Sequence, residues 1–468
     1  MKKIIKPVLI FLLVVTVGVT AFAKTDDRDE IIEQARLFSS EFYEMMMLLL
    51  DDYAGRELTP AILYEAALRG MADELDAFSE YMSADEFKSF TDSLSGHFEG
   101  IGIQVDNDED GRLYIFYVIP GSPAEEAGLL NGDRILKING TDAEDLTQYM
   151  AAELIRSLDE AVVLEINRNG FEYSFTMDKR VIALESVEVL GFDDIFSFAD
   201  DRCDNIRYIY LSSFDMESSS GFRRALRSFA DDGVEGIILD LRGNSGGYLD
   251  QVVAIARMIL PEGPIYYEVD ASGEMSAFFS RLKNLPFEHI VVLTDRYTAS
   301  ASELLAAALQ DSGVATVVGE TTYGKGVIQT SVDLITGGAF KYTYAEYLRR
   351  SGEKIDRIGV IPDEYVKLPE TLPDGIELDE HGASEHIILL KDILGFLDYE
   401  ITDASSVYDE NTREQVKIFK DVSGLNKTDA LDADTIAALN DLLYTIYAET
   451  DVVLETGYNI LLEKIGRK

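Results

Sequence analysis

Apolar residues recur at helical spacing near both ends of the chain and at strand spacing in its middle. From Asp26 to about Phe90 they come at three- and four-residue steps, which predicts amphipathic helices, one of them beginning at Pro60 after Thr59. Short apolar runs that end at Gly- or Pro-containing turns then predict strands as far as residue 180. Beyond them, apolar runs alternate with helical segments up to residue 375, which predicts an α/β layer with mixed or parallel strands. A further helical stretch follows.

The chain is long enough for several domains, because it has 468 residues, of which 47% are hydrophobic. We expect a multidomain fold that combines an α/β core with a small β-rich domain and helical segments. The expected parts, in chain order, are a signal peptide (1–23), an N-terminal helical region (24–95), a β-rich domain (96–180), an α/β core (181–375), a helical module (384–446) and a C-terminal helical tail (447–468).

The first residues have the pattern of a targeting segment. Lysines up to Lys6 precede an uninterrupted apolar run from Pro7 to Val19, and an A-x-A cleavage signal ends at Ala23. The apolar run is short for a membrane span. The pattern therefore predicts export across the cytoplasmic membrane with cleavage after Ala23, and an uncleaved anchor is the alternative.

The formal charge of -45 at pH 7 argues against nucleic acid as a partner, because phosphate binding requires basic surfaces. The charge favours a soluble, self-repelling surface. The single cysteine, Cys203, cannot form an internal disulfide, and its acidic neighbours Asp201 and Asp204 argue against a reactive thiol. Met45–Leu50 is apolar on too many sides for a lone surface helix, so it either packs under a core or forms an interface with a partner.

The β-rich domain carries a glycine-rich segment, Gly100–Val105, that leads into a strand, and a turn-helix-turn segment from Val118 to Asp133. These segments resemble a PDZ domain of the kind attached to bacterial proteases. A Gly-Ile-Gly-Ile loop beside a strand edge leaves N–H groups free to bind a C-terminal carboxylate while the peptide adds as a strand. A β module that only packs is the alternative. The loop residues expected to bind substrate are Gly100, Ile101, Gly102 and Ile103.

Two residues in the stretch 290–329 carry the candidate chemistry. Ser300 lies between an apolar strand and the start of a helix, where free N–H groups such as that of Ala301 can stabilise an oxyanion. A serine hydroxyl needs a base, and none of the histidines lies in a recognisable motif. Lys325 has glycine neighbours and apolar flanks, and a lysine whose pKa is lowered by burial can replace histidine.

Longer motifs around these residues resemble the C-terminal processing peptidase (tail-specific protease) family over about residues 30–370. The matching segments are Thr298–Glu303, Tyr323–Gly326, Asp240–Gly247 and Leu68–Asp76. The resemblance implies that Ser300 is the nucleophile, Lys325 the base and Gln329 the residue that orients the lysine. It also implies that Gly246 supplies a second N–H group to the oxyanion, beside that of Ala301.

The architecture of this family implies a PDZ domain that controls access to a serine protease. It also implies cleavage of proteins near their C-termini, outside the cytoplasmic membrane. Many members pair through terminal helices, which would account for the apolar Met45–Leu50 patch. The expected partners are therefore proteins or peptides with accessible C-terminal tails and a second copy of the chain. No cofactor or metal is expected.

Two other functions remain open. Gly243–Gly247 fits the G-x-S-x-G pattern, so Ser245 could be the nucleophile of a hydrolase that uses a downstream histidine such as His381 or His386. The family loop commonly has proline at this position, which favours Ser245 as a substitution in an oxyanion loop. A non-catalytic envelope scaffold would instead bind partner C-termini through the PDZ-like domain without turnover.

The helical module at 384–446 resembles a peptidoglycan-binding domain, which would imply contact with the cell wall. It departs from that pattern at Lys420, where glutamine is usual, and at Asp429, where glycine is usual. Wall binding and a role in dimerisation or packing are therefore both open. Arg168, near the end of the PDZ-like domain, either contacts the catalytic core or is a plain exposed arginine.

Overall fold

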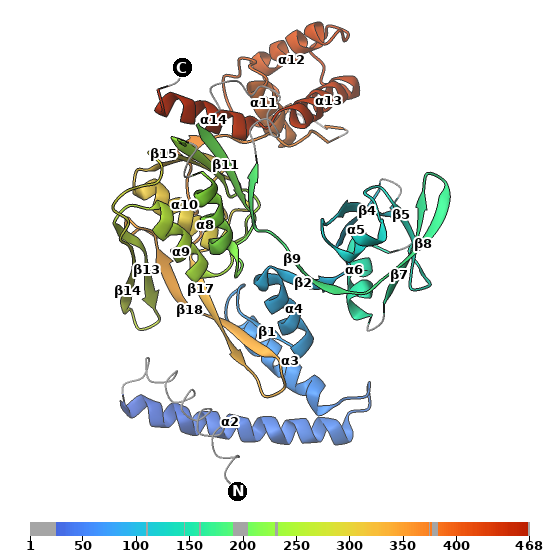
Figure 1. Ribbon diagram of the computed structural model, residues 1–468, viewed down its shortest axis with the longest axis vertical. Helices are drawn as coiled ribbons and strands as arrows, with labels where there is room; N and C mark the ends of the chain where they lie inside the picture. The colour runs from blue at the N-terminus through green and yellow to red at the C-terminus, as the bar shows by residue number, and fades with distance from the viewer. Residues whose placement is uncertain are drawn as a thin grey trace.

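The computed structural model describes most of the chain, and Figure 1 shows its elements. The described residues are 25–108, 111–144, 146–158, 161–190, 205–229, 233–373, 375–376 and 382–466. The predicted signal peptide, Cys203 and His381 lie outside these ranges. Within them, no helix is both long and apolar enough to cross a membrane.

The N-terminal region is helical, as predicted. Its helices are α2 (Thr25–Asp52), α3 (Pro60–Asp73) and α4 (Ala84–Ser95). The predicted start of α3 is confirmed, since Thr59 caps the helix by accepting a hydrogen bond from the N–H of Ile62. Helix α2 lies apart from the α/β core (Figure 1) and leaves much of its apolar surface uncovered: Met45 is 54% exposed and Leu48 is 53% exposed. Within the described part of the chain, the Met45–Leu50 patch therefore does not pack under a core.

The small β-rich domain is connected to the rest of the chain by a two-stranded ribbon, β2 (His97–Gly100) and β9 (Arg180–Ala183). Its other elements are β3 (Ile103–Asn107), β4 (Leu113–Val118), α5 (Pro123–Ala127), β5 (Arg134–Ile138), β6 (Thr141–Asp142), α6 (Gln148–Ser157), β7 (Val162–Arg168) and β8 (Phe171–Met177). The sheet order is β3-β4-β5-β7-β8, with β6 paired to β5. Strand β3 is therefore an edge strand, and α6 packs beside it, as a PDZ domain requires.

The α/β core is built on a mixed six-stranded sheet of order β10-β11-β12-β15-β16-β19, in which only β10 runs antiparallel to its neighbour. The strands are β10 (Val187–Leu190), β11 (Ile206–Leu211), β12 (Gly236–Asp240), β15 (His289–Thr294), β16 (Ala315–Gly319) and β19 (Glu364–Tyr365). One face packs on α8 (Ser218–Ser228), α9 (Leu249–Ile259) and α10 (Ala301–Asp311). The loops after β12 and β15 leave the same edge of the sheet, where ligands bind in folds of this kind.

A second sheet joins segments that are far apart in the sequence. Its order is β1-β18-β13-β14, with β17 paired to β18. The strands are β1 (Glu80–Met82), β13 (Gly263–Asp270), β14 (Met275–Ser280), β17 (Val327–Asp333) and β18 (Ala339–Leu348). Strand β1 pairs antiparallel with β18, with Glu80 opposite Lys341. The N-terminal region is thus built into the core by a strand that the sequence patterns did not predict.

The chain ends in four helices, α11 (His386–Phe396), α12 (Glu410–Val422), α13 (Ala433–Glu449) and α14 (Val452–Lys464). The first three enclose their own apolar core. Helix α14 packs instead on the six-stranded sheet of the α/β core, here called the main sheet. It covers the face that α8, α9 and α10 leave free (Figure 1). The approach is close: a Cβ added at Gly457 would lie 2.8 Å from Leu293 Cδ2. The predicted C-terminal tail is therefore a layer of the α/β core.

The helical module contains a buried lysine at the position where it departs from the peptidoglycan-binding pattern. Lys420 is 1% exposed, and its amine lies 2.6 Å from Asp432 Oδ2 and 2.9 Å from Thr428 Oγ1. The pairing lowers the pKa of Asp432 to about 2. Lys420 therefore stabilises the module internally and does not present its amine to a ligand.

Candidate active site

Ser300 occupies the sharp turn between β15 and α10. Its backbone angles, φ 56° and ψ -115°, are rare for a residue with a side chain and cost about 1–3 kcal/mol. The turn before it is held by Asp295, whose Oδ1 accepts from the N–H of Tyr297 at 3.0 Å and from that of Thr298 at 2.8 Å. The surrounding structure thus holds a strained backbone that points the serine out of the helix.

Glu303 connects the turn that carries Ser300, here called the serine turn, to residues 320–326, which carry Lys325 and are here called the lysine loop. Its carboxylate accepts from the N–H of Ser300 at 2.8 Å, the N–H of Lys325 at 2.8 Å and the N–H of Gly324 at 2.6 Å. The hydroxyl of Thr322 donates a fourth hydrogen bond at 2.5 Å. Burial raises the pKa of Glu303, and the four hydrogen bonds oppose that rise. This linking role was not predicted, because Glu303 entered the sequence interpretation only as the last residue of the motif Thr298–Glu303.

The side chains of Ser300 and Lys325 line one cavity of about 820 Å³. Burial lowers the pKa of Lys325, and the positive charge of Lys341 lowers it further, against the negative charges of Glu303 and Asp76. Among the described side chains, no hydrogen bond joins the Ser300 hydroxyl to the Lys325 amine. The cavity therefore holds a strained serine and a lysine with weakened affinity for its proton.

Gln329 lines the same cavity from β17. Its Nε2 donates to Thr343 Oγ1 on β18 at 3.1 Å. The amide oxygen of Gln329 has no donor among the described groups, so it is free to accept a hydrogen bond from a neighbouring amine.

The loop after β12 lies directly against the serine. A Cβ added at Gly246, where φ is 109°, would lie 3.0 Å from Ser300 Cβ and 3.1 Å from Ala301 N. The N–H of Gly246 donates to Asn244 Oδ1 at 2.9 Å. The N–H groups of Ala301 and Gly247 have no acceptor among the described residues. Ala301 thus has a free N–H, whereas the N–H of Gly246 is bound by Asn244 and those of Ser245 and Gly247 have no acceptor among the described residues.

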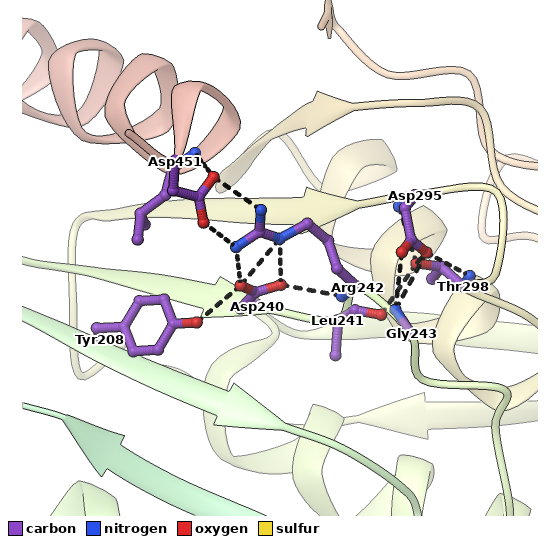
Figure 2. A network of polar contacts seen from close by, with 9 residues as sticks. Tyr208, Asp240, Leu241, Arg242, Gly243, Asp295, Thr298 and Asp451 are labelled. Atoms are coloured by element: carbon purple, nitrogen blue, oxygen red, sulfur yellow. Dashed lines mark hydrogen bonds and ion pairs between the residues drawn. The ribbon is translucent and has the colours of Figure 1, made fainter. Parts of the chain in front are cut away.

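Figure 2 shows how this loop is anchored to the C-terminal helix. Arg242 binds Asp240 through two nitrogens, with Nε–Oδ1 and Nη2–Oδ2 distances of 3.0 and 2.6 Å. It binds Asp451, the N-cap of α14, at 2.9 and 2.7 Å. The hydroxyl of Tyr208 donates to Asp240 at 2.7 Å. Burial alone would lower the pKa of Arg242, but its hydrogen bonds to the two carboxylates outweigh burial and raise it.

The same figure shows that the two loops are bonded to each other. The N–H of Gly243 donates to the carboxylate of Asp295, at 3.0 Å to Oδ2. The hydroxyl of Thr298 donates to the carbonyl of Leu241 at 2.9 Å. A displacement of Arg242 would therefore also displace the turn that carries Ser300.

Ser245 also lines the cavity, but no histidine does within the described part of the chain. His97 lies in β2, His289 begins β15, and His386 begins α11. The ring of His386 lies 3.5 Å from the hydroxyl of Ser384.

The predicted substrate loop of the β-rich domain is placed beside the edge strand β3. Ile101 is buried, and its carbonyl accepts from the N–H of Ala124 at 2.9 Å. The N–H groups of Ile101 and Gly102 have no acceptor within the described structure. Both residues are buried, and their role in binding substrate stays a prediction.

Arg168 has a different role from the two that were considered. It pairs with Asp133, which is 1% exposed, at 2.6 Å, and it donates to the carbonyl of Gly128 at 2.9 Å. It therefore stabilises the β-rich domain internally, and of the two alternatives that were considered, contact with the core is not seen among the described residues.

Comparison with known proteins agrees with this architecture. The model of peptidase family S41 matches residues 205–366, and that of the PDZ domain matches residues 89–167. Carboxy-terminal processing protease CtpA of Bacillus subtilis (strain 168) is 31% identical over 412 residues, 86% of this chain and 86% of that protein. The carboxyl-terminal-processing protease of Synechocystis sp. is 34% identical over 362 residues, 75% of this chain and 83% of that protein. A solved structure of the photosystem II D1 C-terminal processing protease aligns with a TM-score of 0.43 and 27% identity, over 71% of this chain and 88% of that one.

The α/β core and the PDZ domain before it define a serine-type peptidase with an attached peptide-binding domain. The chain belongs to the carboxy-terminal processing protease family of peptidase family S41. The predicted family, fold class and enzyme class are confirmed.

Proposed function

We propose that this peptidase is exported and cleaves proteins near their C-termini, with Ser300 as nucleophile and Lys325 as general base. The observation that carries the assignment is the carboxylate of Glu303, which binds the N–H groups of both residues across two loops. The lowered pKa of Lys325 supports the role of a base, since a larger fraction of the amine is neutral at a given pH. The leader at residues 1–23 supports export.

In the proposed reaction the neutral amine of Lys325 takes the proton of the Ser300 hydroxyl while Oγ attacks the scissile carbonyl. The N–H of Ala301 and an N–H of the Gly246–Gly247 pair stabilise the oxyanion. Protonated Lys325 then gives its proton to the leaving amine, and an acyl-enzyme remains on Ser300. Water, activated by the same amine, hydrolyses the ester and restores the serine. The free amide oxygen of Gln329 orients Lys325.

Substrate tails are proposed to dock first on the PDZ domain. The free N–H groups of Ile101 and Gly102, with their neighbours Gly100 and Ile103, bind the terminal carboxylate, and the tail adds as a strand beside β3. The exposed Met45–Leu50 patch is the surface proposed to pair two copies of the chain.

Replacement of the proposed nucleophile tests the assignment. Purified Ser300→Ala protein should lose cleavage of a panel of peptides with apolar C-terminal tails, measured by mass spectrometry. Ser245→Ala is the matched control, because Ser245 lines the same cavity, and it should keep cleaving. Lys325→Ala should be as inactive as Ser300→Ala.

Two other outcomes would favour other functions. An inactive Ser245→Ala variant beside an active Ser300→Ala variant would favour a hydrolase that uses Ser245 and a histidine. Tail binding without turnover, unchanged in Ser300→Ala, would favour a scaffold.

A further inference from the structure

The turn before β1 places an aromatic ring against the proposed base. The Nζ of Lys325 lies 4.7 Å from the centroid of the Phe78 ring. Phe78 is half-buried, and it belongs to the turn Asp76–Ser79 between α3 and β1. The pairing of β1 with β18 fixes this turn beside the cavity. The N-terminal region thus supplies a direct contact to the lysine.

The turn is held by contacts that do not involve the lysine. The N–H of Phe78 donates to Asp76 Oδ1 at 2.8 Å, and the N–H of Ser79 donates to the carbonyl of Asp76 at 3.2 Å. The hydroxyl of Ser79 accepts from the N–H of Thr343 at 3.3 Å. The backbone hydrogen bonds therefore hold the Phe78 ring in place. The long side chain of Lys325 is able to move away from the ring.

Charged groups face Lys325 from each element around it. Lys341 lies on β18, Glu303 on α10 and Asp76 in the turn. Lys341 is itself paired with Glu80, and its Nζ lies 4.8 Å from the centroid of a second ring, that of Phe90. An aromatic face attracts an ammonium group and has no comparable attraction for a neutral amine. Phe78 therefore favours the protonated lysine, as the two carboxylates do.

We propose that Phe78 is a positioning residue for Lys325, whose ring holds the protonated amine in the resting enzyme and releases the neutral amine to Ser300. This inference rests on the proposed role of Lys325 as base. Loss of the proton removes the attraction to the ring, so the amine becomes free to move at the moment when it can accept a proton. The turn Asp76–Ser79 in this way sets the pH at which the proposed dyad of Ser300 and Lys325 becomes active.

The test measures the titration of Lys325 without requiring turnover. Competitive labelling with trace acetic anhydride over a series of pH values, followed by mass spectrometry of the peptide that contains Lys325, gives the pKa of the amine. The comparison is made in Ser300→Ala protein. Phe78→Leu keeps an apolar side chain but removes the ring, and should lower the labelling pKa by about half a pH unit. Phe78→Tyr keeps the ring and should leave the titration unchanged.

An unchanged or raised labelling pKa in Phe78→Leu overturns the proposal. Melting temperatures check that each variant is folded, and Phe78→Met replaces Phe78→Leu if the latter loses the fold. With Ser300 restored, the acid limb of kcat/KM should move down by the same amount in Phe78→Leu and stay in place in Phe78→Tyr. If the labelling pKa falls in Phe78→Leu but the protein with Ser300 intact cleaves no peptide, Lys325 is not the base, and the positioning role is overturned with it.

Discussion

Glu303 holds together two loops although it is neither of the proposed reacting groups. Its carboxylate is fully buried and accepts four hydrogen bonds, three of them from the backbone of the serine turn and the lysine loop. Two carboxylate oxygens have enough lone pairs to accept all four. The relative placement of Ser300 and Lys325 therefore depends on a residue that lies behind them.

Glu303→Gln should reduce kcat by about 100-fold, because the amide nitrogen would face N–H donors and displace one of the two loops. It should also lower the free energy of unfolding by about 1–3 kcal/mol, since a buried donor would lose its acceptor. Steady-state kinetics and urea denaturation measure the two effects. Ser302→Ala is the control on the same helical turn, because the buried Ser302 hydroxyl has no hydrogen-bond partner among the described residues and its removal should leave both quantities nearly unchanged. Equal kcat values for the two variants would contradict the role of Glu303.

The pH dependence of activity should report the lysine. The rate should rise with pH as Lys325 loses its proton, and the midpoint should lie below 10.5, the ordinary lysine pKa, because burial and Lys341 disfavour the charged form. A pH profile of kcat/KM measures this midpoint. Lys341→Met should move the midpoint upward, since it removes the neighbouring positive charge. A midpoint near pH 6 that does not respond to this change would indicate a histidine base instead.

Helix α14 is the element on which the loop after β12 is anchored. Asp451 has two tasks: it caps α14 by accepting from the N–H of Leu454 at 3.0 Å, and it binds the guanidinium of Arg242. Arg242 leads directly into the loop that contains Gly246. Helix α14 is thus connected to the loop after β12 by one ion-pair network (Figure 2).

Two variants of Asp451 separate its tasks. Asp451→Asn keeps a good helix cap but removes the charge that pairs with Arg242, so it should lower kcat with little loss of stability. Asp451→Ala removes both and should cost about a further 1 kcal/mol of unfolding free energy. Urea denaturation and peptide cleavage measure the difference. If Asp451→Asn retains full activity, the ion pair does not position the loop.

At the scale of the whole molecule, the catalytic layer is assembled from both ends of the chain. Strand β1 enters its second sheet from the N-terminal region, and α14 covers its main sheet from the C-terminal end. Truncation after Glu449 should therefore expose the apolar face formed by Ile238, Val291 and Leu293, and the protein should aggregate or lose cooperative unfolding. Light scattering and calorimetry measure these outcomes. A soluble, active truncated protein would show that α14 is dispensable.

Local patterns in the sequence predicted most of the elements but neither β1 nor the long-range partners, and Ser300 and Lys325 as the reacting pair stay a prediction. The cap at Thr59, the strand-turn-helix at Ser300 and the PDZ domain were each visible in a short window. The contact of Arg242 with Asp451 joins residues 209 positions apart. The ring of Phe78, before β1, contacts Lys325, which lies in the loop between β16 and β17. Hydrophobic periodicity indicates which face of an element is buried but not which segment covers it. For this reason α14 was predicted only as a tail.

The position of α14 after Ser300 and Lys325 in the sequence also determines when the α/β core is completed during synthesis. A ribosome delivers the N-terminus first, so Ser300 and Lys325 emerge well before residues 452–464. Until those residues are delivered, the main sheet lacks the helix that covers one of its faces, and Arg242 lacks one of its two carboxylates. The nascent chain therefore carries Ser300 and Lys325 before the helix that supports their loops, and we expect peptidase activity to appear only after residues 452–464 have been delivered.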